Sequence, residues 1–153
     1  MKFVRGTDPA PEPSTSLQIE EIGPEHADAA SRIIADGFDI SRKAAPMLAG
    51  LVGRPRWHVY MSFAAGEPAG AGIMFVDSGV AWLDWGATVP AHRRKGSQTA
   101  MLARRIRDAL TMGCRLMMTT TGEEVPDDPQ HSYHNIERVG FRPAYLRDNC
   151  APT

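Results

Sequence analysis

Three cations stand immediately before a glycine and a helix-like segment. Arg93, Arg94 and Lys95 precede Gly96, and apolar residues follow at helical spacing as far as residue 112. The start of a helix already carries positive partial charge, so further cations there cost stability. A bound anion such as a phosphate reverses that balance, because the same charges then attract it. The pattern therefore predicts an anion site at this helix start.

The backbone around Gly96 suits a diphosphate. Without a Cβ, glycine lets the main chain approach a ligand closely. The N–H groups of Ser97, Gln98 and Thr99 have no acceptor within the helix that they begin. With the preceding cations they would form a cradle for a pyrophosphate. Neither the pattern Gly-x4-Gly-Lys-Ser/Thr nor Gly-x-Gly-x-x-Gly occurs in the chain, so the common nucleotide-binding loops are excluded.

Two histidines, His131 and His134, have a spacing that is found in helical metal sites. A structural or catalytic zinc site needs at least one more protein ligand at a matching position. The sequence offers none, so no metal is predicted.

The elements that position these residues alternate between strands and helices. In chain order we expect strand 17–22, helices 24–37 and 41–53, strands 57–63, 69–76 and 80–89, helix 96–112, strand 114–121, helix 131–139 and strand 141–149. On helix 96–112, the side chains of Arg104, Arg105, Arg107 and Asp108 are expected to cover the face opposite the apolar stripe.

The strands predict a mixed sheet in an α/β (α+β) fold. Strands 57–63, 69–76 and 80–89 are joined by tight turns and form an antiparallel meander. The long helix after residue 96 then connects two strands of the same sheet, which makes those two strands parallel.

The whole chain indicates one domain with a leader. It has 153 residues and a formal net charge of -1, so a general nucleic-acid or membrane binder is not expected. Residues 1–16 are expected to be a flexible, proline-rich leader, and residues 17–153 a single domain. The first five residues fit either a short strand or the remnant of something longer. Two cysteines without a framework, and no apolar signal segment, favour a reducing, cytoplasmic setting.

Two segments resemble the GNAT-type N-acetyltransferases. Residues 89–102, VPAHRRKGSQTAML, are similar to the pyrophosphate motif Arg/Gln-x-x-Gly-x-Gly/Ala, with Arg93 and Gly96 in place. Gln98 stands where most members have Gly or Ala, and its side chain leaves the phosphate site open if it points outward. Residues 134–141, HNIERVGF, resemble the helix and Gly-Phe pair near the C-terminus of these proteins. The resemblance covers roughly residues 17–150.

This resemblance implies a central mixed, mostly antiparallel sheet with one parallel, splayed pair of strands and helices on both faces. It implies direct transfer of an acetyl group from acetyl-CoA to a primary amine. The backbone of Thr88 and Val89 would pair with the pantetheine arm, and a strand N–H near Thr88 would polarise the thioester carbonyl. The backbone N–H groups that would hold the pyrophosphate are those of Arg94, Lys95, Gly96, Ser97, Gln98 and Thr99.

The resemblance also fixes where catalytic groups are sought. The tyrosine that family members aim at the departing sulfur is replaced by Ile136, so Asn135 or Ser132 would contact the cofactor or sulfur instead. Tyr133 is a further candidate. Asp84 is our preferred base for the amine, since alternation puts it on one strand face with Trp82 and Thr88. His92 and Tyr133 are the alternatives, or the amine arrives neutral from solvent.

Two other functions compete with acetyl transfer. Loss of the usual tyrosine is compatible with a non-catalytic acyl-CoA-binding or regulatory module. Binding of RNA through the arginine-rich segments is disfavoured by the near-zero net charge and the lack of an aromatic platform. The acceptor would be an amine of a small molecule or a peptide, and the acidic loop 122–130 favours a cationic one. A homodimer is compatible with the sequence.

Overall fold

The computed structural model describes residues 1–122 and 131–147. Its strands are β1 (Lys2–Arg5), β2 (Gln18–Glu21), β3 (Trp57–Ala64), β4 (Glu67–Asp77), β5 (Val80–Thr88), β6 (Leu116–Thr120) and β7 (Arg142–Tyr145). Its α-helices are α1 (Ala27–Gly37), α2 (Ala45–Ala49), α3 (Ser97–Thr111) and α4 (His131–Arg138), and 3-10 helices occupy Pro24–His26, Arg42–Ala44 and Pro90–His92. Within these residues the strands form one sheet in the order β2-β3-β4-β5-β6-β1-β7.

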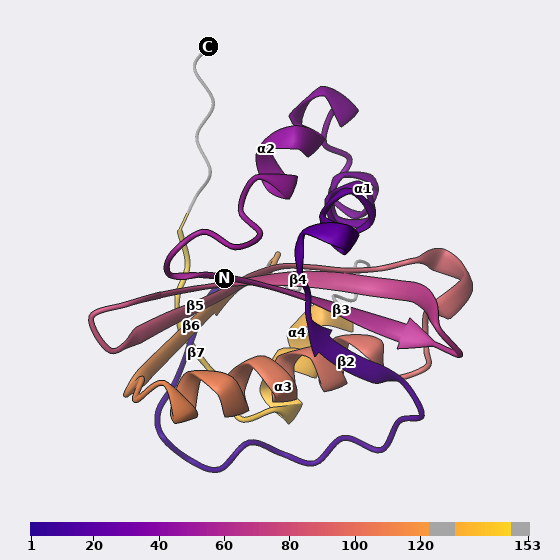
Figure 1. Cartoon of the computed structure of the whole chain (residues 1–153). Coiled ribbons are helices and arrows are strands. Elements are labelled where there is room, and N and C mark those ends of the chain that lie inside the picture. The colour runs from indigo at the N-terminus through magenta and orange to yellow at the C-terminus, as the bar shows by residue number, and fades with distance from the viewer. Residues whose placement is uncertain (123–130, 148–153) are drawn as a thin grey trace.

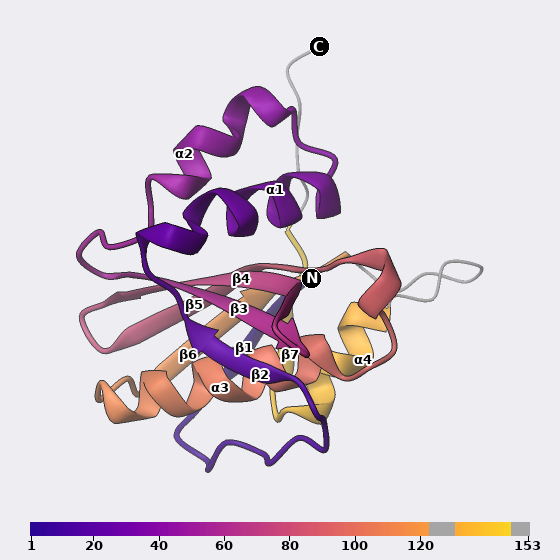
Figure 2. The same cartoon turned by 45° about the vertical axis from the view of Figure 1, so that its right-hand side comes forward.

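The helices lie in two layers around this sheet. Helices α1 and α2 cover one face, and α3 and α4 cover the other (Figures 1 and 2). Strands β5 and β6 are parallel, while the other neighbouring strands are antiparallel. The predicted mixed sheet with helices on both faces is confirmed.

Two tight hairpins build the antiparallel part of the sheet. Ala65 and Gly66 join β3 to β4 with φ angles of 50° and 85°, and Ser78 and Gly79 join β4 to β5 with φ angles of 49° and 77°. A two-residue turn with both φ angles positive has a twist that matches that of the flanking strands. The predicted meander over β3, β4 and β5 is therefore confirmed.

Strand β5 carries a bulge in its second half. Its partners on β4 go from Ile73 opposite Asp84 to Ala71 opposite Ala87, so that two β5 residues face one β4 residue. The first of the two, Trp85, has a φ angle of 54°. An inserted residue reverses the alternation of side chains beyond it. Asp84 therefore shares a face with Ala87, and the prediction that it shares one with Thr88 is wrong.

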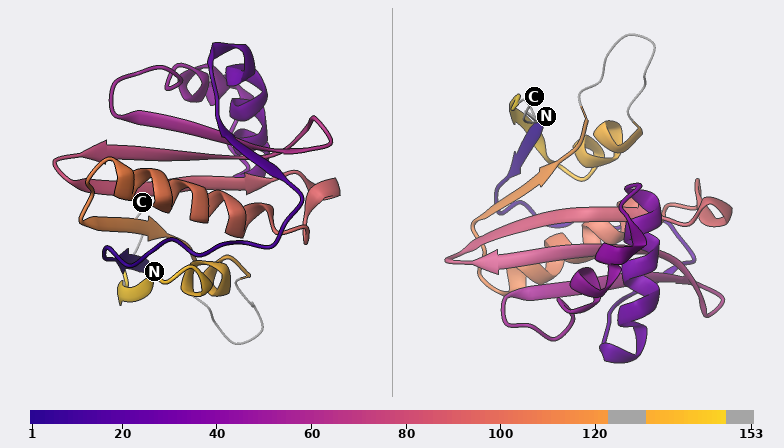
Figure 3. Two further views of the ribbon diagram at one scale, coloured as in Figure 1. Left: turned by 60° about the horizontal axis from the view of Figure 1, so that its bottom comes forward. Right: turned by 90° about the horizontal axis from the view of Figure 1, so that it is seen from above.

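Beyond this bulge the two parallel strands separate. Pairing between β5 and β6 runs from Val80 opposite Leu116 to Leu83 opposite Thr119 and then stops, although β5 continues to Thr88. Seen from above, β6 turns away from β5 (Figure 3, right). The expected splayed pair is present, and residues from both strands border the opening.

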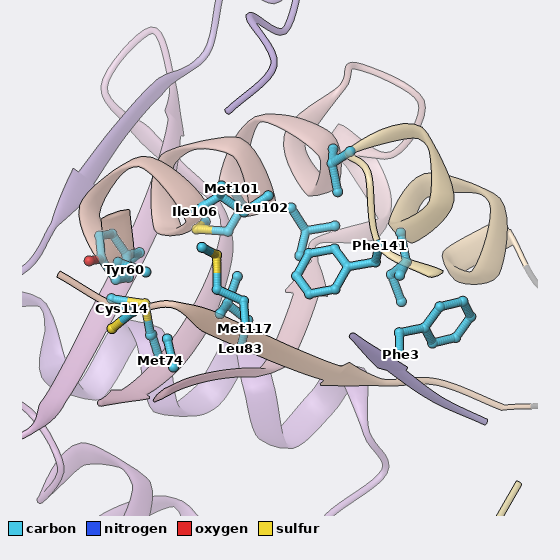
Figure 4. Packing of buried hydrophobic residues seen from close by; sticks show 14 residues of the cluster. Phe3, Tyr60, Met74, Leu83, Met101, Leu102, Ile106, Cys114, Met117 and Phe141 are labelled. Carbon is cyan, nitrogen blue, oxygen red and sulfur yellow. The ribbon is translucent and has the colours of Figure 1, made fainter. Parts of the chain in front are cut away.

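The larger hydrophobic cluster lies between the sheet and the layer of α3 and α4. Met101, Leu102 and Ile106 of α3 meet Leu83 of β5 and Met117 of β6 there (Figure 4). A second cluster packs the other face under α1 and α2. The first cluster includes residues of β5 and β6, and Trp85 of β5 also packs against the second, so β5 is held from both sides of the sheet.

Helix α3 departs from its predicted pattern at one residue. Arg105 is 2% exposed and extends to backbone carbonyls of β4 and β5, so the expectation that it faces solvent is wrong. Arg104 and Arg107 pair with Asp108 and Glu12 at the surface of the helix. A local pattern of charged residues did not show that one of them reaches the sheet.

The N-terminal residues belong to the sheet. Strand β1 lies between β6 and β7, with Phe3 opposite Thr119 and Val4 opposite Arg142, and Phe3 is fully buried. Residues 2–5 of the predicted leader 1–16 are therefore part of the sheet, and residues 6–16 lie outside it. Residues 6–16 then run past α3 to β2 at the far edge (Figure 3, left). No helix among the described residues is both long and apolar enough to span a membrane.

Candidate active site

The N-terminus of α3 is open, as the anion-site prediction requires. Gly96 is the N-cap with a φ angle of 80°, and no side chain caps the helix. The backbone hydrogen bond from Ala100 N to Gly96 O, 3.0 Å long, starts the helical series. The preceding N–H groups of Ser97, Gln98 and Thr99 are therefore the donors that a helix leaves unpaired. A Cβ on Gly96 would lie 3.5 Å from Thr15 Cβ, so backbone conformation rather than space demands glycine.

A groove of about 940 Å³ lies in front of this helix start. Three elements form its walls: the end of β5, the loop into α3, and α4. Its lining residues are Gly37, Gly86, Ala87, Thr88, His92, Arg93, Arg94, Gly96, Ser97, Gln98, Thr99, His131, Ser132, His134, Asn135 and Arg138. They include three arginines and three histidines but no carboxylate, so among the described residues the field of the groove is positive. Such a groove attracts anions.

The Gln98 side chain links α3 to α4 across the floor of the groove. Its Nε2 donates to Ser132 Oγ at 3.1 Å, and its Oε1 accepts from Asn135 Nδ2 at 2.8 Å. Arg138 Nη1 then donates to Asn135 Oδ1 at 3.3 Å. The side chain therefore turns toward α4 and does not point outward. Its amide occupies the space that a glycine or alanine at this position would leave empty.

A second, inner cavity of about 150 Å³ lies where β5 and β6 separate. Asp84 and Gly86 line it from β5, and Thr119 and Thr120 line it from β6. Gly86, Gln98 and Ser132 line both the groove and the inner cavity, so the two spaces meet at these residues. The inner cavity also borders Phe38, which packs edge-on against Trp85.

Asp84 presents a perturbed carboxyl group to the inner cavity. Burial raises its pKa, because desolvation disfavours the charged form. The N–H of Trp85, which donates to Asp84 Oδ1 at 2.9 Å, and the positive charges of Arg105 and Lys2 oppose this rise. A carboxylate whose pKa is raised is a better proton acceptor than an ordinary one. Asp84 is therefore suited to take a proton from a bound ammonium group.

Several predicted site residues come together, but three lie elsewhere. Thr88, Arg94, Gly96, Ser97, Gln98, Thr99 and Asn135 line the groove, and Asp84 lines the inner cavity. Lys95 is exposed beside the loop, with its Nζ 3.4 Å from His92 Nδ1. Val89 already donates its N–H to Ala69 O and accepts from His92 N. Tyr133 packs edge-on against Phe3 and does not line either cavity.

Gly86 and Arg105 are among the residues of the inner cavity that were not predicted from the sequence as part of the site. Glycines inside strands mark bulges or close approaches, and Gly72 and Gly86 carry that signal. Arg105 gave no signal, because it stands among charged residues of an amphipathic helix. The described residues contain no cluster of three metal-ligating side chains. The acidic residues of the loop 122–130, Glu123, Glu124, Asp127 and Asp128, lie outside the described part of the chain.

Comparison with solved structures defines the fold. A putative acetyltransferase from Agrobacterium tumefaciens superposes with a TM-score of 0.73 at 15% identity, over 88% of this chain and 99% of that one. The aminoglycoside acetyltransferase AAC(6')-Iy, in complex with a bisubstrate analogue, superposes with a TM-score of 0.70 at 18% identity, over 89% of this chain and all of that one. The fold is that of the GCN5-related N-acetyltransferases.

A third structure with the GCN5-related fold is longer than this chain. The GCN5-related N-acetyltransferase from Kribbella flavida superposes with a TM-score of 0.68 at 19% identity, over 93% of this chain. This chain spans 53% of that protein. No family model and no curated protein sequence matches the chain, so the likeness rests on the three-dimensional fold.

Proposed function

We propose that this protein is an N-acetyltransferase that moves an acetyl group from acetyl-CoA directly to a primary amine of a small molecule or peptide. The observation that carries this proposal is that the groove and the inner cavity adjoin and share three lining residues. The groove has an uncapped helix start, and the inner cavity has the half-buried carboxyl of Asp84. A diphosphate with a long arm and a reactive end, as in acetyl-CoA, suits such an arrangement.

The groove has the donors that the phosphates would need. The N–H groups of Ser97, Gln98 and Thr99 would hold the diphosphate, with Arg93 and Arg94 adding attraction. The carboxylate-free lining supports this assignment, since no charge in the described lining repels phosphate. The pantetheine arm would then pass Thr88 and Asn135 toward Gly86. Because both backbone groups of Val89 are already bonded, the proposal leaves Val89 out of the contacts to the arm.

At the inner end, the residues of this chain would perform proton transfer and orientation. Asp84 would accept a proton from the acceptor ammonium, which frees the nitrogen lone pair for attack on the thioester carbonyl. Acetyl-CoA supplies the acyl group, and a new C–N bond replaces the C–S bond. Holding amine and thioester together in this confined space would supply much of the acceleration.

Departure of the sulfur does not require a strong acid. A thiol with a pKa near ~8.5 leaves readily as the thiolate. Ser132 lines both cavities, and its Oγ accepts from Gln98 Nε2, which leaves its own O–H able to donate. Ser132 would therefore stabilise the leaving sulfur in the place where Ile136 replaces the usual tyrosine.

Calorimetry and a thiol-release assay test the proposal. We expect acetyl-CoA to bind the wild-type protein, and a panel of primary amines to include at least one acceptor. Replacing Asp84 by Asn should lower kcat by a factor of about 10²–10⁴ while acetyl-CoA binding persists. Activity of the wild type should fall as the pH drops through the raised pKa of Asp84, and this dependence should disappear in Asp84→Asn.

The outcomes of these measurements separate the competing functions. Binding of acetyl-CoA without turnover on any amine would favour a non-catalytic acyl-CoA-binding module. Absence of acetyl-CoA binding would contradict both the acetyltransferase and the acyl-CoA-binding module. An Asp84→Asn enzyme that keeps the rate and pH profile of the wild type would leave acetyl transfer in place and remove Asp84 as the base.

A further inference from the structure

We propose that Arg105 is a positioning residue: it bridges β4 and β5 at the bulge and places a permanent positive charge against the inner cavity, opposite Asp84. The mechanism above does not use Arg105. The catalytic consequence rests on the proposed function, but the structural and electrostatic parts do not.

The first observation is the burial of an arginine without a partner carboxylate. Arg105 is 2% exposed, and no described carboxylate lies within salt-bridge distance of its guanidinium group. Its acceptors are carbonyl oxygens: Ile73 O at 2.8 Å, Asp84 O at 3.0 Å and Met101 O at 3.3 Å. A buried cation is costly unless its surroundings compensate it well. An apolar side chain would fill the same interior at lower cost, so this residue calls for a functional reason.

The second observation is where the guanidinium group binds. Its Nη1 donates to one carbonyl on β4 and one on β5, at the pair Ile73 and Asp84 that borders the bulge. A bulge interrupts the regular hydrogen bonds between two strands and bends the strand that carries it. One nitrogen that holds both strands at this point fixes how far β5 bends. It thereby fixes the backbone from Asp84 to Gly86, which lines the inner cavity.

The third observation is that Gly72, a glycine inside β4, makes room for this group. A Cβ on Gly72 would lie 3.1 Å from Arg105 Cζ, tighter than nearly all such contacts, whereas one on Gly86 would make an ordinary contact of 3.5 Å with Nη2. Nη2 donates to no group in the described part of the chain, and Arg105 lines the inner cavity. The guanidinium group is therefore seated between the strands with one edge toward the cavity.

The fourth observation is the charge that this arrangement gives to the cavity. Burial lowers the pKa of Arg105 to about 10, so the group stays protonated at neutral pH. Its charge acts on Asp84, as does that of Lys2 from β1, and the Tyr60 hydroxyl of β3 also interacts electrostatically with Arg105. The cation opposes the effect of burial on Asp84 and keeps more of the carboxyl ionised at a given pH. An ionised Asp84 is the form that accepts a proton.

Substitution of Arg105 by Gln and by Lys tests this role. Gln removes the charge and Lys keeps it, while neither reproduces the flat group that bridges two strands. The exposed Arg107 of the same helix provides the matched control, Arg107→Gln. For each protein we would follow the titration of the Asp84 carboxyl by ¹³C NMR, acetyl-CoA affinity by calorimetry, kcat and KM by thiol release, and folding by thermal melting.

The expected results differ between the variants. In Arg105→Gln the pKa of Asp84 should rise, and kcat should fall by about 100-fold with its acidic limb moved to higher pH. In Arg105→Lys the pKa of Asp84 should stay near its wild-type value, while kcat still falls because the bridge is lost. Acetyl-CoA affinity should change little in both variants, since neither substitution alters the groove in front of the α3 start. Arg107→Gln should match the wild type throughout.

The contrary results are equally defined. A folded Arg105→Gln protein with an unmoved Asp84 titration would overturn the electrostatic part, and wild-type kcat in Arg105→Lys would overturn the positioning part. If Arg105→Gln does not fold, the kcat of Arg105→Lys decides. A lowered kcat in that variant would support positioning, and a wild-type kcat would mean that Arg105 only fills space. Loss of acetyl-CoA affinity in step with kcat would show general damage and would also overturn the proposal. The Asp84 titration needs no turnover, so it decides even if the wild-type protein acetylates no amine.

Discussion

At the scale of single residues, Gly96 acts through its backbone conformation. Its φ angle of 80° lies in the left-handed region, which costs other residues about 1–2 kcal/mol. This conformation turns the chain from the basic loop into α3 and leaves the first N–H groups of the helix facing the groove. Gly113 beyond the other end of α3 also has a φ angle of 80°, with no atom near its missing Cβ. The same helix therefore offers an internal comparison.

We predict that Gly96→Val lowers coenzyme A affinity by at least about tenfold, because the turn must rearrange and misdirect the N–H groups of Ser97 and Gln98. Gly113→Val is the matched control: it should lower stability by a similar amount and leave coenzyme A affinity unchanged. Isothermal titration calorimetry and thermal melting measure both quantities. Equal coenzyme A affinity in Gly96→Val and the wild type would remove the diphosphate site from this helix start.

Residue-level prediction from sequence succeeded where the signal is local. The cations, Gly96 and the helix period stand next to one another in the chain, so the open helix start was predictable. The side chain of Arg105 was misjudged and the direction of the Gln98 side chain was left open, because their partners are 21 to 32 and 34 to 37 positions away in the chain. The prediction that Thr88 shares a strand face with Asp84 was wrong for a similar reason. Alternation counts residues in one strand, and the bulge depends on how β5 pairs with β4.

At the scale of elements, Gln98 links α3 to α4 by hydrogen bonds. Its amide spans the junction of groove and inner cavity, where Gly86 and Ser132 also lie. Two hydrogen bonds hold it there, at 3.1 Å to Ser132 and 2.8 Å from Asn135. The side chain therefore narrows the passage through which an acyl group would reach Asp84.

We predict that Gln98→Ala widens this passage and lets longer acyl groups react. The ratio of kcat/KM for propionyl-CoA, whose acyl group is one methylene longer, to that for acetyl-CoA should rise by about tenfold, since a pocket discriminates by roughly that factor per methylene group. Ser132→Ala removes one hydrogen bond but keeps the bulk of Gln98, so its ratio should stay at the wild-type value. An unchanged ratio in Gln98→Ala would mean that other residues limit the acyl chain.

Most elements were predictable because their signals lie within them. The hairpin turns, the strand alternation and the apolar stripe of α3 each cover a few neighbouring residues. Strand β1 was left open because four residues carry little periodicity, and its place between β6 and β7 depends on partners more than 100 positions away. Pairing at that distance is a property of the folded sheet and cannot be read from the strand alone.

At the scale of the whole molecule, residues 6–16 connect β1, next to one edge of the sheet, to β2 at the opposite edge, and they pass the loop that precedes Gly96. Arg5 Nη2 donates to Pro9 O at 2.7 Å, and Arg107 pairs with Glu12 at 2.9 Å. Thr15 Oγ1 then donates to Lys95 O at 2.9 Å and accepts from Leu17 N at 3.2 Å. The predicted leader therefore includes a contact that holds the carbonyl immediately before Gly96. Fixing that carbonyl restricts the loop that would bind phosphate.

We predict that Thr15→Val weakens coenzyme A binding by about fivefold. Valine keeps the shape of threonine but removes the bonds to Lys95 O and from Leu17 N. Of these, the bond to Lys95 O restrains the loop, and a typical hydrogen bond contributes about 1 kcal/mol. Glu12→Gln is the control, because it weakens only an exposed ion pair in the same segment, a type of contact that contributes little to stability. Calorimetry should therefore show weaker binding in Thr15→Val alone. Equal losses in both variants would mean that the whole segment supports the loop, and no loss in either would mean that the loop holds its shape without it.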